Sequence, residues 1–197
     1  MELQKRIKSY IRISKTANIA RRYFILNGFD GLYTMLGIII GAYVAGHQEP
    51  GIVLGAGLSG IMALGLSGSA SAYISERTEQ ERELERLERH MLTELDSTLQ
   101  GKARVFGSLF TAMVNGFAPI ITSLIMVSPF FLAAWGWIGI ENAFVGSILL
   151  GVLEIFGFGC LLGQRMKNSV KLQYGMYMLG AASITAVVSY FIGRTFT

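Results

Sequence analysis

The feature that most limits how this chain can fold is the length of its runs without charge. Arg104 and Glu141 enclose 36 residues that carry no charged side chain, and Glu49 and Glu76 enclose 26. A further run of 22 residues ends just before Arg194. A mostly apolar run of about 18 residues or more is long enough to cross a bilayer as a helix. The sequence therefore predicts an all-α, polytopic membrane protein.

We place five membrane spans, over residues 24–45, 51–75, 105–134, 143–163 and 172–193. The third run contains Pro119 and Pro129, so we expect its helix to be kinked or tilted. Trp135 and Trp137 follow it, where aromatic side chains anchor a helix at the membrane surface. The chain then divides into a basic segment (1–23), two spans (24–75), a charged segment (76–104) and three further spans (105–197).

The distribution of Lys and Arg predicts how the spans are oriented. Residues 1–22 hold seven basic side chains, the segment between the second and third spans holds six, and loops 46–50 and 135–142 hold none. Basic segments face the cytosol. We therefore expect a cytosolic N-terminus and a C-terminus outside. Apolar residues near helical spacing favour a basic amphipathic helix at the N-terminus, lying on the inner leaflet. A disordered basic tail would orient the chain equally well.

The charged segment between the second and third spans has the composition of a helix. Residues 76–99 lack Gly and Pro and are rich in Glu, Arg and Leu, so we expect them to continue the second span into the cytosol. The simpler interpretation of its eight acids is a solvated face with pairs such as Glu85–Arg89. The alternative is a carboxylate site that collects divalent cations. Its candidate residues are Glu76, Glu79, Glu83, His90 and Glu94.

Small residues recur every four positions along the second span. They are Gly55, Ser59, Ala63, Ser67, Ser71 and Ser75. Such a stripe lets another backbone come close. We expect the stripe to pack within one bundle, and whether it also faces a second copy of the chain remains open from this pattern.

Two acids inside the spans require a physical reason. Asp30 lies in the first span and Glu154 near the middle of the fourth, and no basic residue lies inside any span to pair with them. A charged side chain at a helix centre costs about 2.5–3.5 kcal/mol on insertion scales. Each acid therefore belongs to an ion or proton site, or stays protonated and hydrogen bonded to a neighbouring carbonyl. With Asn27 and Asn115, they are our candidates for the ion path.

Several function classes are excluded by what the chain lacks. Cys160 is its one cysteine, and His47 and His90 are its two histidines, so a disulfide or a Cys-based metal cluster within the chain is excluded. The glycine-rich stretches lack the Lys and Ser/Thr of a phosphate loop. No nucleophile–His–acid set is present, and no nucleic-acid motif accompanies the basic tail. We therefore expect neither an enzyme nor a permanently bound cofactor.

Short motifs spread over all five spans resemble the vacuolar iron transporter family. Residues 30–34 (Asp-Gly-Leu-Tyr-Thr), followed by glycine-rich helix, are similar to the first helix of that family. Further matches lie at residues 73–75, 116–119 and 190–194. The resemblance implies a five-helix homodimer that exports ferrous iron or manganese from the cytosol in exchange for protons. It also implies that Asp30 contacts the ion.

The chain departs from the family pattern in its second helix. Where the family has Gly-Glu-Tyr preceded by a methionine, this sequence has Ser71, Ala72 and Tyr73, with Gly68 at the methionine position. The charged segment is also too short for the larger metal-collecting domain of the full-length members. We interpret the chain as a short, divergent transporter of Fe²⁺ or Mn²⁺. The alternative is a non-transporting membrane protein that uses its charged helix for interaction or assembly.

Overall fold

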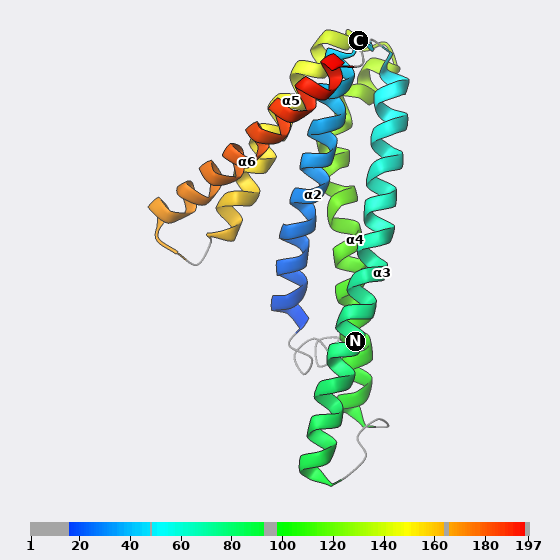
Figure 1. Ribbon diagram of the computed structural model, residues 1–197, viewed down its shortest axis with the longest axis vertical. Coiled ribbons are helices and arrows are strands. Elements are labelled where there is room, and N and C mark those ends of the chain that lie inside the picture. Colours follow the sequence, from blue (N-terminus) through cyan, green and yellow to red (C-terminus); the bar gives the residue numbers. More distant parts are fainter. Residues whose placement is uncertain (1–15, 48, 93–97, 164–165, 196–197) are drawn as a thin grey trace. The chain divides into compact units, whose positions relative to one another are not determined.

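The computed structural model describes residues 16–47, 49–92, 98–163 and 166–195. Within these ranges the chain is entirely helical, with α2 at Thr16–Val44, α3 at Pro50–Met91, α4 at Leu99–Ala134, α5 at Ile140–Leu162 and α6 at Asn168–Thr195 (Figure 1). Each of these helices contains a stretch long and apolar enough to cross a membrane, which confirms the predicted fold class. The expected basic helix at the N-terminus lies outside the described residues as far as residue 15.

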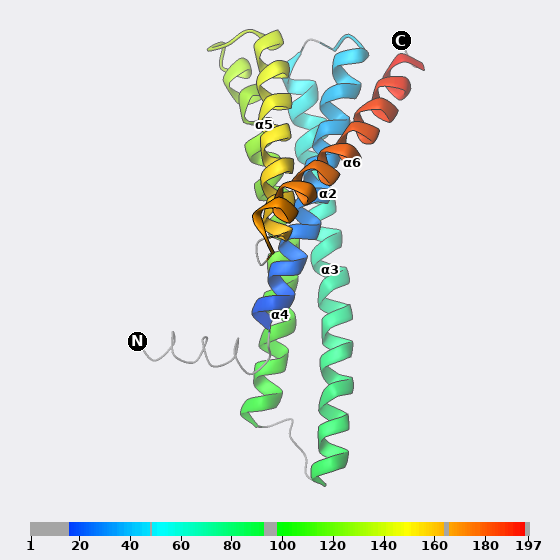
Figure 2. The ribbon, with the colours of Figure 1, turned by 90° about the vertical axis from the view of Figure 1, so that its left-hand side faces the viewer.

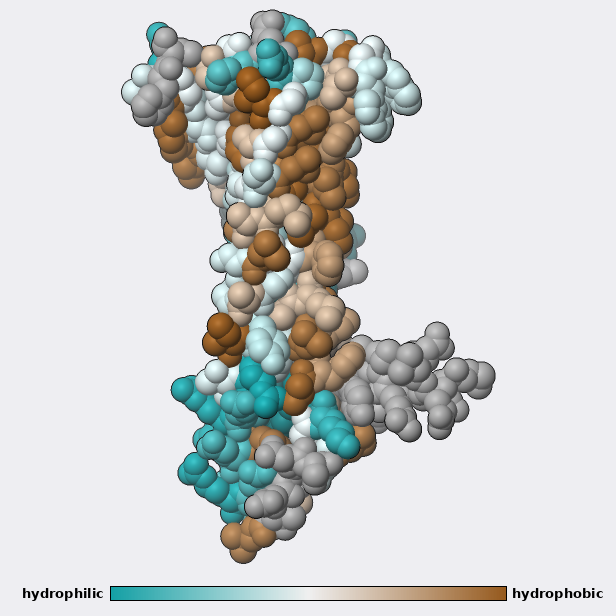
Figure 3. Space-filling model, turned by 90° about the vertical axis from the view of Figure 1, so that its right-hand side faces the viewer, coloured by the Kyte–Doolittle hydropathy of each residue, from teal (hydrophilic) through white to brown (hydrophobic). Residues whose placement is uncertain are grey.

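The longest helix confirms that the second span continues beyond the membrane. At 1.5 Å per residue, the 42 residues of α3 extend for about 63 Å, roughly twice the thickness of a bilayer's hydrocarbon core. Hydrophilic surface gathers on the charged end of this helix (Figure 3). The helix ends at Met91, and Leu92 takes a positive φ of 52°. Because α4 begins at Leu99, the segment 76–104 holds the end of one helix and the start of the next.

The chain divides into two compact units, described here separately. Unit 1 comprises residues 1–24 and 65–117, and unit 2 comprises residues 25–64 and 118–197. In unit 1, α4 approaches the backbone of α3 closely at Gly116, where a Cβ atom would lie 2.7 Å from the carbonyl oxygen of Gly65. A glycine is required here because any side chain would separate the two helices.

Unit 2 holds the apolar core. Its fully buried side chains include Leu32 and Met35 of α2, Phe130 of α4 and Ile155 of α5. Helices α5 and α6 run antiparallel and pack on each other (Figures 1 and 2). Their closest approach is at Gly159, where a Cβ atom would lie 2.6 Å from the Cα atom of the facing glycine on α6. Small residues therefore set the helix spacing in this unit, as is usual where no water drives association.

Candidate ion site and its surroundings

Asp30 lies on the exposed side of α2, although its two neighbours are buried. Phe29 is 5% exposed and belongs to the core of unit 2, and Gly31 is buried against α4. A Cβ atom at Gly31 would lie 2.6 Å from the Cα atom of Pro119, so the two backbones touch directly beside the carboxylate. One turn away, the Thr122 hydroxyl donates to the carbonyl of Gly28 at 3.1 Å. The carboxylate therefore projects outward from a firmly packed pair of helices.

Glu154 has a different environment from Asp30. It is half-buried on α5, and its Oε2 atom is buried with no hydrogen-bond partner in the part of the chain that the structure describes. The expected alternative of a protonated carboxyl bonded to a nearby carbonyl is thus not seen at this oxygen. A carboxyl in such a place is suited to holding a proton, because an ionised group would be poorly solvated.

The two predicted asparagines do not join these acids in a single cluster. Asn27 is half-buried on α2 in unit 2. Asn115 belongs to unit 1, is 3% exposed, and donates from Nδ2 to the carbonyl oxygen of Gly68 at 2.7 Å. This bond fastens α4 to α3. Sequence reasoning identified Asn115 as polar at membrane depth but not as a helix–helix contact.

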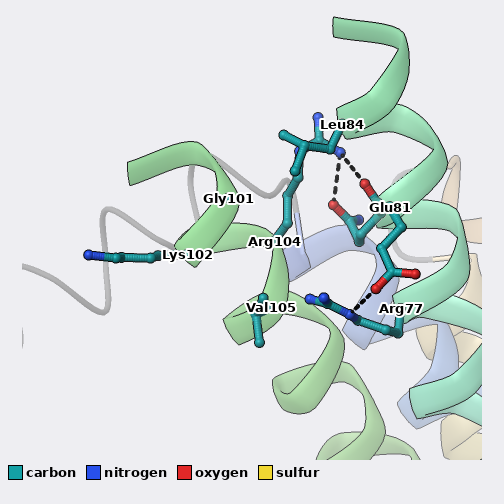
Figure 4. Close-up of a pocket in the computed structure, with 8 residues that line it drawn as sticks. Arg77, Glu81, Leu84, Gly101, Lys102, Arg104 and Val105 are labelled. Carbon is teal, nitrogen blue, oxygen red and sulfur yellow. Dashed lines mark hydrogen bonds and ion pairs between the residues drawn. The ribbon is translucent and has the colours of Figure 1, made fainter. Parts of the chain in front are cut away.

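The carboxylates of the charged end of α3 are mostly engaged by cations and hydrogen-bond donors. Arg104 of α4 donates to Glu83 Oε2 at 2.8 Å and to the side chain of Gln80 at 3.1 Å. Arg77 pairs with Glu81 at 2.6 Å on α3 (Figure 4). Arg104, Gln80, Arg77 and Glu81 line a pocket of about 280 Å³ that also touches the first turn of α4. Arg104 was missed from sequence, because it lies more than 20 residues from its partners.

The remaining candidates for cation collection are dispersed along α3. Glu76 is half-buried and hydrogen bonded to Tyr23 of α2, whereas Glu79 is exposed. His90 donates from Nδ1 to the carbonyl oxygen of Arg86 at 2.6 Å. Glu94 lies outside the described residues. Across the ranges that the structure describes, no three His, Cys, Asp or Glu side chains lie close enough to hold a metal ion.

One ion pair that was predicted from the sequence supports the simpler interpretation, in which the charged residues of α3 form a solvated face. Arg89 contacts Glu85 at 3.3 Å, with both side chains largely exposed. Such a pair contributes only tenths of a kcal/mol. Collection of cations at the charged end of α3 therefore stays a prediction, and it would need carboxylates from more than one chain.

The stripe of small residues on α3 is exposed along its whole length. Gly55, Ser59, Ala63, Ser67, Ser71 and Ser75 each lie on the surface of the chain, and a Cβ atom at Gly55 would meet nothing within 4 Å. Beside it, Ala72 is 3% exposed, so the neighbouring face of the same helix is the one that packs within the chain. The expectation that the stripe packs within one bundle is therefore wrong for the described residues.

Comparison with known proteins points to one family. The model of the VIT family matches residues 21–105, a region that includes Asp30 and the stripe on α3. The chain is also 28% identical, over 178 residues and 89% of each chain, to an uncharacterized protein, MJ0645, of Methanocaldococcus jannaschii. No solved structure matches. The match to the VIT family and the five long apolar helices together support an integral membrane protein.

Proposed function

We propose that this chain moves a divalent metal ion, Fe²⁺ or Mn²⁺, out of the cytosol in exchange for protons. The observation that carries the proposal is Asp30, an exposed carboxylate on a membrane helix, with no Lys or Arg in any of the five spans placed from the sequence. A dication supplies the missing charge, and carboxylate oxygens suit both metals. The contact between Gly31 and Pro119 fixes the helix that carries this carboxylate.

Purified protein in liposomes tests this function directly. With a metal-sensitive dye and a pH-sensitive dye inside, added Mn²⁺ is expected to enter while protons move the other way. Protein-free liposomes are the control. A non-transporting assembly protein, the alternative role, would give neither signal, and it would depend on the charged end of α3 instead.

We propose that two copies of the chain meet along the small-residue stripe of α3. The stripe is exposed and regularly spaced, and small residues are what allow membrane helices to approach closely. Asp30 is exposed in the single chain, so a second copy also offers a way to shield it from lipid. The molecular mass of the solubilised protein, measured by light scattering, distinguishes a dimer from a monomer.

The proposed orientation places the charged end of α3 in the cytosol and the loop after α2 outside. In a Cys160→Ala background, Glu49→Cys should react with a membrane-impermeant thiol reagent added to intact cells. Glu85→Cys should react only after the cells are permeabilised. Both native side chains are exposed, so access depends on the side of the membrane alone. Labelling of position 49 solely from the cytosol would refute the five-span arrangement.

We assign the exchanged proton to Glu154, because its buried Oε2 is unpaired in the described part of the chain. Glu154→Gln keeps the shape and removes the titrating group. The variant is expected to bind metal as the wild type does but to lose the pH dependence of its flux in liposomes. Glu141→Gln, on an exposed turn of the same helix, serves as the matched control. A Glu154→Gln protein with the wild-type rate and pH profile would remove this acid from the mechanism.

A further inference from the structure

Among the described residues of unit 2, Glu154 is one of three buried polar side chains that have an atom without a hydrogen-bond partner. The other two are the hydroxyls of Ser123 on α4 and Ser147 on α5, and both residues are 0% exposed. Serines inside helices often bond the carbonyl four residues back, as Ser183 of α6 does with Leu179 at 2.9 Å. An unpaired buried polar group costs about 1–3 kcal/mol. Three such costs in one unit point to a shared cause.

The three groups lie along one contact between two helices. Ser147 and Glu154 are seven residues apart, so they occupy the same face of α5, about 10.5 Å from each other along its axis. The contacts between α4 and α5 place Gly146 beside Pro129 and Gly151 beside Met126. Continuing this antiparallel register by one turn brings Ser123 to the level of Glu154. The unpaired groups therefore follow a seam between α4 and α5.

Pro129, beside Gly146 at this contact, leaves one backbone carbonyl of α4 without its usual helical donor. It lies inside α4 and is buried, and proline has no N–H to donate. The carbonyl of Ile125, four residues earlier, thus loses its usual helical partner between the levels of Ser123 and Ser147. A buried water molecule is stable where two to four polar partners surround it. Glu154 and Ser123, which the register places at the same level, are two such groups.

We propose that water occupies this seam and carries protons between Glu154 and the end of α5 at Ile140. Ser147 lies between Glu154 and that end, so its hydroxyl bridges the route. The metal would use the exposed carboxylate of Asp30 on α2, and the proton would use the interior of the α4–α5 contact. This inference rests on the proposed proton exchange and adds its route.

Few other charges or titratable groups bear on this route. Residues 118–134 of α4 and 50–64 of α3 contain none. On α5 itself, Glu141 lies beside Ile140 at the end of the route, and Cys160 lies six residues beyond Glu154. The titratable side chains on the other helices of unit 2 are Asp30, Tyr33 and Tyr43 of α2, and Lys171, Tyr174, Tyr177, Tyr190 and Arg194 of α6. Of these, Tyr43 stacks edge-on against Phe144, three residues before Ser147.

Hydrogen–deuterium exchange of the Glu154 carboxyl tests the route without measuring transport. The carbonyl stretching band of protonated Glu154 is identified in the infrared spectrum by its loss in Glu154→Gln. After transfer to D₂O, Ser147→Ala is expected to slow the shift of this band at least tenfold, because it removes a bridging hydroxyl. Ser128→Ala, on the exposed side of α4, should leave the rate unchanged.

A second measurement does not depend on how Ser147→Ala folds. In a Cys160→Ala background, Ser147→Cys should react with a small hydrophilic thiol reagent, because water lets the thiol ionise. Ser128→Cys, which is exposed on α4, should stay unreactive in lipid. An unchanged exchange rate together with an unreactive Ser147→Cys would show a dry seam and overturn the route. If Ser147→Ala slows the exchange as expected but the protein moves no metal, the proton route would stand and only the transport function would be refuted.

Discussion

Replacing Asp30 by asparagine is expected to reduce metal transport to the background of protein-free liposomes. The amide has nearly the same size and can still accept a hydrogen bond, but it neutralises none of the charge of a dication. Folding should be unchanged or slightly improved, because a carboxylate without a partner is costly at membrane depth. Metal uptake and the thermal unfolding midpoint, measured on the same preparation, separate these two effects.

A matched control for Asp30→Asn is Glu49→Gln, which removes an exposed carboxylate outside the helices. It should transport like the wild type. Metal binding measured by calorimetry should be lost in Asp30→Asn and kept in the control. Retention of transport by Asp30→Asn would contradict the proposed function and favour the non-transporting alternative.

Gly31→Ala is expected to have the largest effect on stability of any single methyl group added to α2. The new Cβ atom would lie 2.6 Å from the Cα atom and 2.7 Å from the carbonyl oxygen of Pro119, and backbone atoms cannot rotate away. Overpacking of this kind costs about 1–3 kcal/mol. The helices must separate beside Asp30, so metal transport should fall together with the thermal unfolding midpoint.

The control for this substitution lies on the same helix. Gly41→Ala adds the same methyl group at a position with nothing within 4 Å, so it should leave both stability and transport unchanged. Equal unfolding midpoints for the two variants would show that α2 and α4 are not held together at Gly31. Loss of transport in both would indicate that α2 must stay flexible along its length.

The five spans could be predicted from sequence because a bilayer imposes a simple requirement. Every backbone polar group in the hydrocarbon must be paired within its own segment, so long charge-free runs have only the helix available. The same reasoning predicted the extension of the second span, since residues 76–91 contain no helix breaker. These conclusions depend on local composition alone.

What could not be predicted depends on residues far apart in the chain. Small residues at every fourth position of α3 indicate that another helix approaches closely. Only the exposure of Ser59 and Ser67 shows that this helix does not belong to the same chain. Asn115 looked like a candidate ligand, yet its amide nitrogen bonds Gly68. A lone polar side chain at membrane depth has several possible partners, and the packing of the helices decides between them.

The position of Arg104 bears on how the chain is assembled during synthesis. Arg104 is the last charge before the uncharged run of 36 residues, and its partners Gln80 and Glu83 precede it in the chain. Both partners have therefore left the ribosome when Arg104 emerges. The contact between α3 and α4 at Arg104 can therefore form before the last two helices have been synthesised, and it fixes how these two helices align along their length.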